Sequence, residues 1–205
     1  MFTNTLPAST KKVLSSLKKT STVQDFYLSG GTGLALQIGH RESHDLDFFS
    51  EKDFNAELLQ KELSKAGHLE NVQLEKGTFN CFMAGIQIQF LYYPYKLLEE
   101  KIGWENIFVS SILDIACTKL LTISSRGNKK DFIDLYFLLQ IYTLPFLFEK
   151  LEEKYTNLNF DKLHILKSLV YFEDAQKQPA PRMHKEINWE IVKKEIKKKV
   201  KDFKI

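Results

Sequence analysis

The stretch Leu28-Ser29-Gly30-Gly31-Thr32-Gly33, followed by Asp45-Leu46-Asp47-Phe48-Phe49, decides the fold predicted for this chain. The first segment joins a short apolar run to a helical pattern, which indicates a glycine-rich turn at the start of a helix. Such a turn lets a ligand approach the backbone, and the helix directs free N–H groups and its positive dipole end at that ligand. A triphosphate fits this chemistry, although a purely structural turn has the same composition. The predicted contacts are Ser29, Gly30, Gly31 and Thr32.

The second segment alternates acidic and apolar residues. On a strand, Asp45 and Asp47 share one face, while Leu46 and Phe48 point into the core. Neighbouring carboxylates repel each other unless a cation lies between them, and carboxylate oxygens suit Mg²⁺ or Mn²⁺. Two solvated acids on an edge strand are the alternative. The glycine-rich turn shortly upstream favours the metal site.

Polar residues fill the connection between the predicted helix and strand. Arg41 lies where it could reach a phosphate. A zinc site made by His40, His44 and an aspartate is conceivable, but without a helix through these positions the spacing carries little information. Solvated loop histidines are the simpler interpretation.

The C-terminal half carries three further candidates. Lys119 lies on or beside an apolar helical stripe, so its side chain either reaches water or meets an anion. Asp131 and Asp134 share a helix face, and capping of that helix by Asn128 would explain Asp131 but not Asp134. An acid within such an apolar run needs a cationic or hydroxyl partner.

Composition sets the class of protein. The chain has 205 residues, with 43% hydrophobic and 27% charged residues, which excludes a disordered or collagen-like chain. Cys81 and Cys117 have no zinc-ligand spacing, and no apolar run is long enough to span a bilayer. We therefore expect a soluble cytoplasmic protein with no membrane partner.

The net charge of +3 is concentrated at the C-terminus. Residues 193–204 contain seven lysines against Glu195 and Asp202, a local charge of +5. Apolar residues at helical spacing predict an amphipathic helix there. Its lysine face is either simply solvated or attracts a polyanion such as RNA.

The pattern divides the chain into an α/β core over 1–108 and a helical domain over 109–205. We expect one small mixed sheet with flanking helices, then a helical bundle, packed as one unit. Predicted strands are 26–28, 45–49, 72–74, 79–84 and 86–92. Predicted helices are 8–19, 31–39, 54–66, 110–124, 129–142, 144–156, 160–175 and 188–202.

Together these motifs resemble the AbiEii/AbiGii nucleotidyltransferase toxin family over roughly residues 26–139. The resemblance is carried by Gly30-Gly31-Thr32, Gly39 to Ser43, Asp45 to Phe49, Ile88-Gln89-Phe90, Leu113 to Lys119, and Arg126 with Lys130 to Leu135. It implies an α+β, polymerase β-like nucleotidyltransferase fold. It also implies that the chain transfers a nucleotide from an NTP to an acceptor hydroxyl, with RNA or tRNA as a candidate acceptor and an antitoxin as a candidate partner.

The resemblance also assigns roles. Asp45 and Asp47 would hold Mg²⁺ or Mn²⁺, Lys119 would offset triphosphate charge, and Asp131, slightly favoured over Asp134, would orient or deprotonate the acceptor. One departure is Gln89, which stands where nucleotidyltransferases of this fold commonly place a third carboxylate. Either Asp131 or Asp134 supplies the missing acid, or the second metal is weak, or activity has been lost. Gln89 also keeps open a non-catalytic nucleotide-binding module. A small-molecule, antibiotic-type nucleotidyltransferase is a further alternative.

Overall fold

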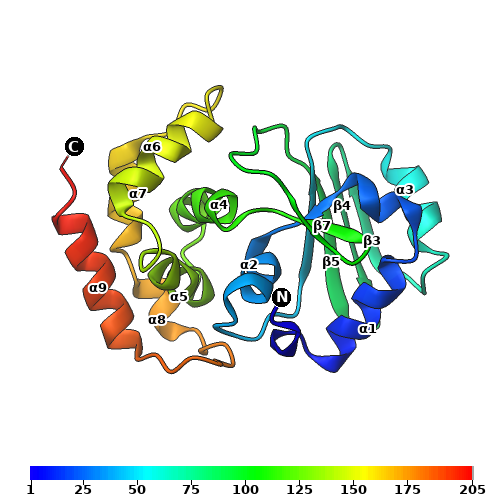
Figure 1. Ribbon diagram of the computed structural model, residues 1–205, viewed down its shortest axis with the longest axis horizontal. Helices are drawn as coiled ribbons and strands as arrows, with labels where there is room; N and C mark the ends of the chain where they lie inside the picture. The colour runs from blue at the N-terminus through cyan, green and yellow to red at the C-terminus, as the bar shows by residue number, and fades with distance from the viewer. Residues whose placement is uncertain (205) are drawn as a thin grey trace.

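The computed structural model describes residues 1–204 and has a mixed α+β architecture in two halves (Figure 1). One half holds a seven-stranded sheet in the order β3-β4-β5-β2-β1-β7-β6. Its strands are β1 (Tyr27–Leu28), β2 (Leu46–Ser50), β3 (Glu70–Glu75), β4 (Thr78–Met83), β5 (Ile86–Tyr92), β6 (Ile102–Trp104) and β7 (Ile107–Val109). The pairs β1–β7 and β2–β5 are parallel, and the other neighbours are antiparallel. The sheet is therefore mixed, as predicted.

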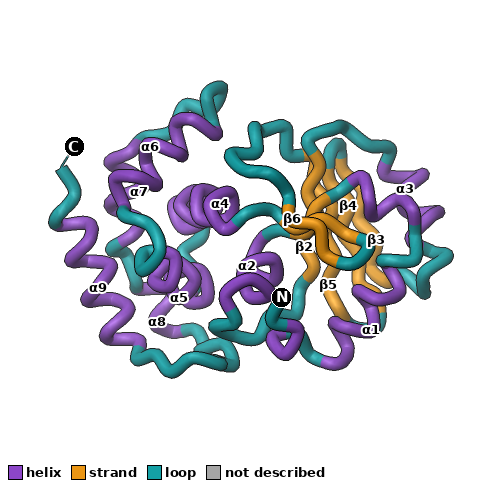
Figure 2. The backbone as a smooth tube through the Cα atoms, in the orientation of Figure 1, coloured by secondary structure: helices purple, strands orange, loops and turns teal. Residues whose placement is uncertain are grey.

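Helices cover the sheet and build the second half. The first three are α1 (Ala8–Leu17), α2 (Gly30–Ile38) and α3 (Ala56–Leu63), with short 3-10 turns at Thr3–Thr5 and Ser21–Asp25. The others are α4 (Ile112–Ser125), α5 (Lys129–Leu138), α6 (Leu144–Lys154), α7 (Lys162–Leu169), α8 (Glu173–Lys177) and α9 (Trp189–Lys201). Figure 2 shows the strands gathered in one half and α4 to α9 in the other.

The core of the sheet half is built from the inward-facing residues of β2 and from the alternation along β5. Leu46 and Phe48 are fully buried, as predicted, and pack in one hydrophobic cluster with Ile88 and Phe90 and with residues of α1 and α3. Turning the strand over would expose these side chains to water, at a cost of about 25 cal/mol per Å² of apolar surface. Their burial therefore determines which face of the strand points inward. The opposite face of β2 is left free for Asp47.

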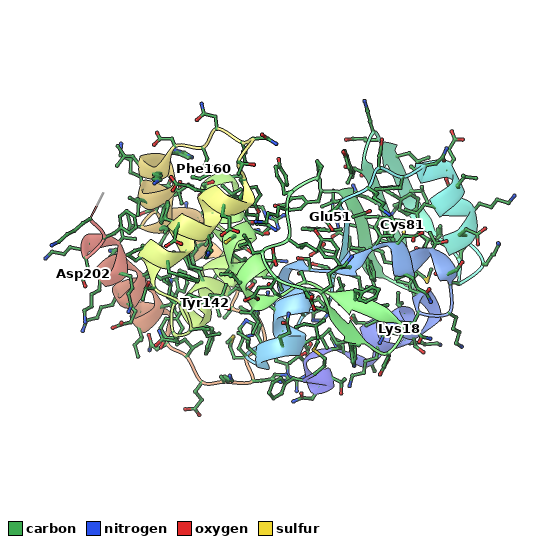
Figure 3. The ribbon with its side chains drawn as sticks, turned by 45° about the horizontal axis from the view of Figure 1, so that its top comes forward. Lys18, Glu51, Cys81, Tyr142, Phe160 and Asp202 are labelled. Atoms are coloured by element: carbon green, nitrogen blue, oxygen red, sulfur yellow. The ribbon has the colours of Figure 1, made fainter. Side chains whose placement is uncertain are left out.

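The helical half has a second cluster, built mainly from α4 to α9. Within it Val192 and Ile196 anchor α9 and leave its lysines on the outside, which confirms the amphipathic C-terminal helix. In Figure 3 Asp202 lies in this half and Cys81 in the sheet half. The free thiols Cys81 and Cys117 are buried in different clusters. The boundary expected at 108/109 stays a prediction.

Two parts of the fold differ from the sequence-based expectation. Strands β6 and β7 were not predicted, because three residues are too few to establish alternation. The single helix expected over 160–175 is divided into α7 and α8. It breaks before Phe172, whose ring packs against Phe132 at 4.8 Å and Trp189 at 5.8 Å, so tertiary packing overrides the helical period.

The segment between α8 and α9 returns to the sheet half. Arg41 and Met183 form an isolated antiparallel bridge, and the His184 N–H donates to the His40 carbonyl oxygen at 2.9 Å. The Glu42 N–H also donates to the Arg182 carbonyl oxygen at 2.8 Å. The C-terminal part of the chain therefore holds the loop that follows α2. Among residues 1–204, no helix has both the length and the apolar character needed to cross a membrane.

Candidate active site

The turn between β1 and α2 begins the site. Gly30 has a φ of +61°, and a Cβ at this position would overlap Asp47 Oδ2, so both the backbone conformation and the close approach require glycine. A Cβ on Gly31 would lie 2.5 Å from Arg41 Nη2. Because α2 starts here, its first N–H groups have no intrahelical acceptor. The turn presents backbone donors beside the Asp47 carboxylate.

The two hydroxyls predicted to bind a triphosphate have internal partners instead. Ser29 is buried, and its Oγ accepts a hydrogen bond from Ser110 Oγ at 2.9 Å. Thr32 is also buried and donates to the Asp45 carbonyl oxygen, with Ser43 Oγ at 2.8 Å. These side chains brace the turn, so a phosphate contact there would come from N–H groups.

Asp45 and Asp47 lie at the start of β2 and line one cleft together, as the alternation predicted. Burial raises the pKa of the Asp47 carboxyl, and the negative charge of Asp45 raises it further. Lys130 Nζ, from α5, lies 3.4 Å from Asp45 Oδ2. The pair of acids therefore already attracts a cation from the helical half.

A buried charged cluster joins the two halves of the chain. Asp134 accepts Arg41 Nε at 2.7 Å and Arg41 Nη2 at 2.8 Å, a bidentate pair, and His40 Nε2 lies 2.7 Å from its Oδ1. Lys119 Nζ lies 2.6 Å from both Asp134 Oδ2 and Asp131 Oδ1. Lys119 therefore meets anions rather than water, which was one of the two expected alternatives.

The charges of this cluster balance. Although burial alone would raise it, the pKa of Asp134 is held well below its usual range by the Arg41 and Lys119 charges. Burial lowers the pKa of His40, despite its hydrogen bond to Asp134, so the imidazole is neutral near pH 7. Two cations face two carboxylates, which is how a fold tolerates charge away from water.

Asp131 and Asp134 differ in one respect. Both are fully buried, but Asp131 contributes to the wall of the cleft and Asp134 does not. Asp131 Oδ2 is buried and has no hydrogen-bond partner within residues 1–204, and Arg126 Nε is 4.0 Å away from it. One carboxylate oxygen of Asp131 is therefore left without a hydrogen bond at the wall of the cleft.

The side chain of Asn128 does not cap helix α5 as the sequence analysis considered. Asn128 is the N-cap residue of α5, but its side chain makes no cap hydrogen bond. Its Oδ1 instead accepts from Gln178 Nε2 at 3.0 Å. Helix capping therefore does not explain Asp131, whose carboxylate faces Lys119 and the cleft.

The cleft between the halves has a volume of about 520 Å³. It is lined by Gly30, Asp45 and Asp47 from the sheet half and by Lys119, Arg126 and Asp131 from the helical half. Aromatic side chains form another part of the cleft wall, called here the aromatic wall. Phe49 and Tyr93 have ring centroids 4.7 Å apart, and Tyr95 lies 4.7 Å from Tyr93 and 4.8 Å from Tyr155. The cleft thus combines acidic residues, cationic groups and aromatic side chains.

Some cleft residues were not predicted as site residues. Lys130 and Arg126 were noted only as parts of a motif, since nothing local indicates that they face Asp45 and Asp131. Gln89 lies on β5 directly beside Asp47 on β2, in the position expected for a third carboxylate. The position of Gln89 beside Asp47 follows from the parallel register of β2 and β5, which local sequence pattern does not reveal.

The structure also addresses the histidine alternative. Within residues 1–204 there is no cluster of three or more His, Cys, Asp or Glu residues arranged to hold a metal ion. His40 is fully buried against Asp134, whereas the His44 side chain is 60% exposed and pairs with Glu42. The two rings therefore face different surroundings and form no zinc site.

Solved structures with a similar fold include nucleotidyltransferases. A protein from H. pylori assigned as a nucleotidyltransferase has a similar structure, with a TM-score of 0.57 at 18% identity, covering 93% of this chain and 89% of that chain. The nucleotidyltransferase toxin MenT4 of Mycobacterium tuberculosis H37Rv has a TM-score of 0.51 at 16% identity, covering 94% and 82%. At these identities the likeness shows a shared fold.

The family is shown by sequence. A family model described as nucleotidyl transferase AbiEii toxin, Type IV TA system, matches residues 12–79 and 94–204. An uncharacterized protein of Aquifex aeolicus (strain VF5) is 40% identical over 187 residues, which is 87% of this chain and 88% of that protein. The chain belongs to the AbiEii nucleotidyltransferase toxin family.

Proposed function

We propose that this toxin-like nucleotidyltransferase transfers an NMP from an NTP to an acceptor hydroxyl, with Mg²⁺ or Mn²⁺ as cofactor and RNA as acceptor. One observation carries the proposal. Asp131, whose Oδ2 has no hydrogen-bond partner within residues 1–204, lines the same cleft as Asp45, Asp47 and the glycine turn. A base, an acidic cation site and phosphate donors are thereby assembled in one place.

The residues present fit a divalent cation. The negative charge of Asp45 contributes to the raised pKa of Asp47, and Lys130 Nζ already occupies a position 3.4 Å from Asp45 Oδ2. A hard cation beside two carboxylates relieves this repulsion and prefers oxygen ligands. When bound, it would neutralise charge on the triphosphate and on the leaving pyrophosphate. Asp45 and Asp47 would hold it.

Other groups would bind the triphosphate. The N–H groups at the start of α2 present donors and a positive dipole end to phosphate oxygens. Arg126 and Lys130 line the cleft and add positive charge. The Arg126 side chain is exposed, and the Lys130 side chain is about half-exposed. Lys119 is already matched by two carboxylates, so we infer that its charge mainly holds Asp131 in place while contributing to the field on the phosphates.

In the transfer step, the acceptor hydroxyl oxygen forms a bond to the α-phosphorus. The bond from that phosphorus to the oxygen bridging to the β-phosphate breaks, and pyrophosphate leaves. Asp131 Oδ2 accepts the hydroxyl proton, a role that general bases fill within hydrogen-bond reach. Asp134 holds Lys119 and Arg41 without touching substrate. The aromatic wall offers a stacking surface for the nucleobase.

The decisive experiment is a transfer assay. The purified protein is incubated with each labelled NTP, Mg²⁺ and total tRNA, beside the Asp45→Ala/Asp47→Ala double variant. We expect label on RNA with the wild type and none with the double variant, and EDTA abolishes the transfer. Label on neither RNA, protein nor a small molecule would refute the enzyme proposal. Label only on a small molecule would favour the antibiotic-type alternative.

One observation favours a second candidate, a non-catalytic nucleotide-binding module with an antitoxin or other protein as partner. Gln89, beside Asp47, can neither carry a charge nor act as a base. This candidate predicts NTP binding that is nearly independent of Mg²⁺ and survives Asp47→Asn. Isothermal calorimetry with and without Mg²⁺ distinguishes this candidate from the enzyme, because NTP binding by the enzyme requires both Mg²⁺ and Asp47.

A further inference from the structure

The N-terminus of α5 is capped by a side chain from a distant part of the chain. The Lys129 N–H, the first of this helix, donates to Gln178 Oε1 at 2.9 Å, across 49 positions of sequence. Gln178 Nε2 in turn donates to Asn128 Oδ1 at 3.0 Å. The first N–H groups of a helix lack intrahelical acceptors, which an N-cap side chain usually supplies. Because Asn128 makes no such bond, Gln178 supplies the acceptor in its place.

The helical turn that Gln178 caps carries two residues of the cleft. Lys130 and Asp131 follow Lys129 directly, and both line the cleft. Lys130 Nζ lies 3.4 Å from Asp45 Oδ2, so this turn also reaches the acidic pair of the sheet half. End turns are the least stable parts of a helix, and they fray when their N–H groups lose their acceptors. The position of this turn therefore depends on Gln178.

The segment that begins at Gln178 also contacts the sheet half. Between α8 and α9 the chain passes beside the loop that follows α2 (Figure 1). The Glu42 N–H donates to the Arg182 carbonyl oxygen at 2.8 Å, and Arg41 and Met183 form an antiparallel bridge. Arg41 also contacts α5 through its bidentate pair with a carboxylate of that helix. Gln178 is therefore the point at which this segment, held to the sheet half, is joined to α5.

We propose that Gln178 is a positioning residue for nucleotide transfer, which holds the first turn of α5 in place and thereby sets the position of the Asp131 carboxylate. This inference rests on the proposed function, since it concerns the base of that same site. Gln178 does not line the cleft, so its effect on the reaction passes through α5. Asp45 and Asp47, which would hold the cation, lie at the start of β2 instead. Loss of the cap should therefore lower kcat more than it changes KM for the NTP.

The test uses four proteins: wild type, Gln178→Met, Gln178→Glu and Gln176→Ala. Methionine keeps the length of the side chain but removes both hydrogen bonds. Glutamate keeps an oxygen that accepts from the Lys129 N–H, and Asn128 can turn its amide to donate to it. Gln176→Ala is the matched control, because the side chain of this neighbouring glutamine accepts from Lys193 of α9, at 3.1 Å, rather than contacting α5.

Three measurements are made on each protein. Initial rates with labelled NTP and tRNA give kcat and KM for the NTP, and thermal denaturation verifies folding. Hydrogen exchange reports on the first turn of α5 and does not depend on activity.

We expect Gln178→Met to lower kcat by about tenfold or more, with KM for the NTP changed by less than about threefold. The first turn of α5 should exchange its amide protons faster, while Gln178→Glu and Gln176→Ala stay close to wild type in both measurements. A double-mutant cycle shows whether Gln178 acts through Asp131. Added to Asp131→Asn, Gln178→Met should lower the residual rate by less than about twofold.

Three results would overturn the inference and leave the enzyme proposal intact. They are a wild-type kcat for Gln178→Met, an equal loss for Gln178→Glu, and an undiminished effect of Gln178→Met in the Asp131→Asn protein. Wild-type protein that labels no acceptor would instead overturn the proposed function itself, together with any role of Gln178 in it.

Discussion

Lys119 and Asp131 form a buried ion pair at the cleft, with 2.6 Å between Nζ and Oδ1, and the pair leaves Asp131 Oδ2 without a partner. The same ammonium contacts Asp134 at 2.6 Å, and Asp134 in turn holds Arg41. Lys119 therefore holds the Asp131 carboxylate at the cleft, while the Asp134 carboxylate balances the positive charge of Lys119. The position of the proposed base depends on this arrangement.

Asp131→Asn should abolish most nucleotide transfer while the protein stays folded. Lys119 keeps Asp134 as its counter-ion, and the amide replaces the carboxylate without a change of shape. General bases contribute about 10²–10⁴-fold, so we expect transfer to fall at least about 100-fold. Initial rates with labelled NTP provide the measurement, and exposed Asp174→Asn serves as control. A rate within tenfold of wild type would remove Asp131 from the base role.

Asp134→Asn should instead destabilise the fold. It removes the carboxylate that holds the buried Arg41 through two hydrogen bonds, at 2.7 and 2.8 Å, and breaking a buried pair costs about 3–5 kcal/mol. Urea denaturation at pH 7 measures the change in unfolding free energy. A loss below about 1 kcal/mol, similar to that of an exposed acid, would show that the cluster does not support the fold.

The same residue predicts a pH dependence. The folded pKa of Asp134 lies well below its usual value of 3.8, so its stabilising contribution is fully present above that value and is lost as pH falls through the folded pKa. The difference in unfolding free energy between wild type and Asp134→Asn should be constant from about pH 7 to pH 5 and should shrink below about pH 4. A difference that grows on acidification would contradict the assigned cause.

Gly30→Ala should damage the site more than the backbone. Gly30 has a φ of +61° and faces Asp47, whereas Gly85 has a φ of +75° and nothing within 4 Å of an added Cβ. Each alanine costs roughly 1–2 kcal/mol for the left-handed conformation. Only Gly30→Ala also displaces the Asp47 carboxylate, so it alone should weaken Mg²⁺-dependent NTP binding. Calorimetry of the two variants checks this, and equal binding would refute the close approach.

Lys154→Met should destabilise the protein far more than Lys96→Met. Lys154 Nζ lies 2.5 Å from Asp114 Oδ1 in a pair that is almost fully buried, whereas the Lys96–Glu153 pair is exposed. We expect about 3–5 kcal/mol for the first change and about 0–1 kcal/mol for the second. Thermal and urea unfolding give both values, and similar losses would mean that burial does not set the strength of these pairs.

Most elements could be predicted from local pattern. The alternation from Asp45 to Phe49 predicted that Leu46 and Phe48 face the core, whereas the helical stripe around Lys119 left open whether this lysine reaches water or meets an anion. The hydroxyls of Ser29 and Thr32 were less predictable, because their partners Ser110 and Asp45 lie elsewhere in the chain. Strands β6 and β7 were not predicted, because a segment of three residues is too short to show an alternating pattern.

By itself, the sequence determined which residues form helices and strands, which faces are apolar and where the glycine turn meets the acids, because these depend on side-chain period and local conformation. Only the tertiary structure decided that Arg41 pairs with Asp134, that Lys130 approaches Asp45 and that Gln89 lies beside Asp47. Those contacts join distant parts of the chain, which local side-chain period cannot place side by side. Arg41 and Asp134 are also buried, and a buried charge requires a matching partner.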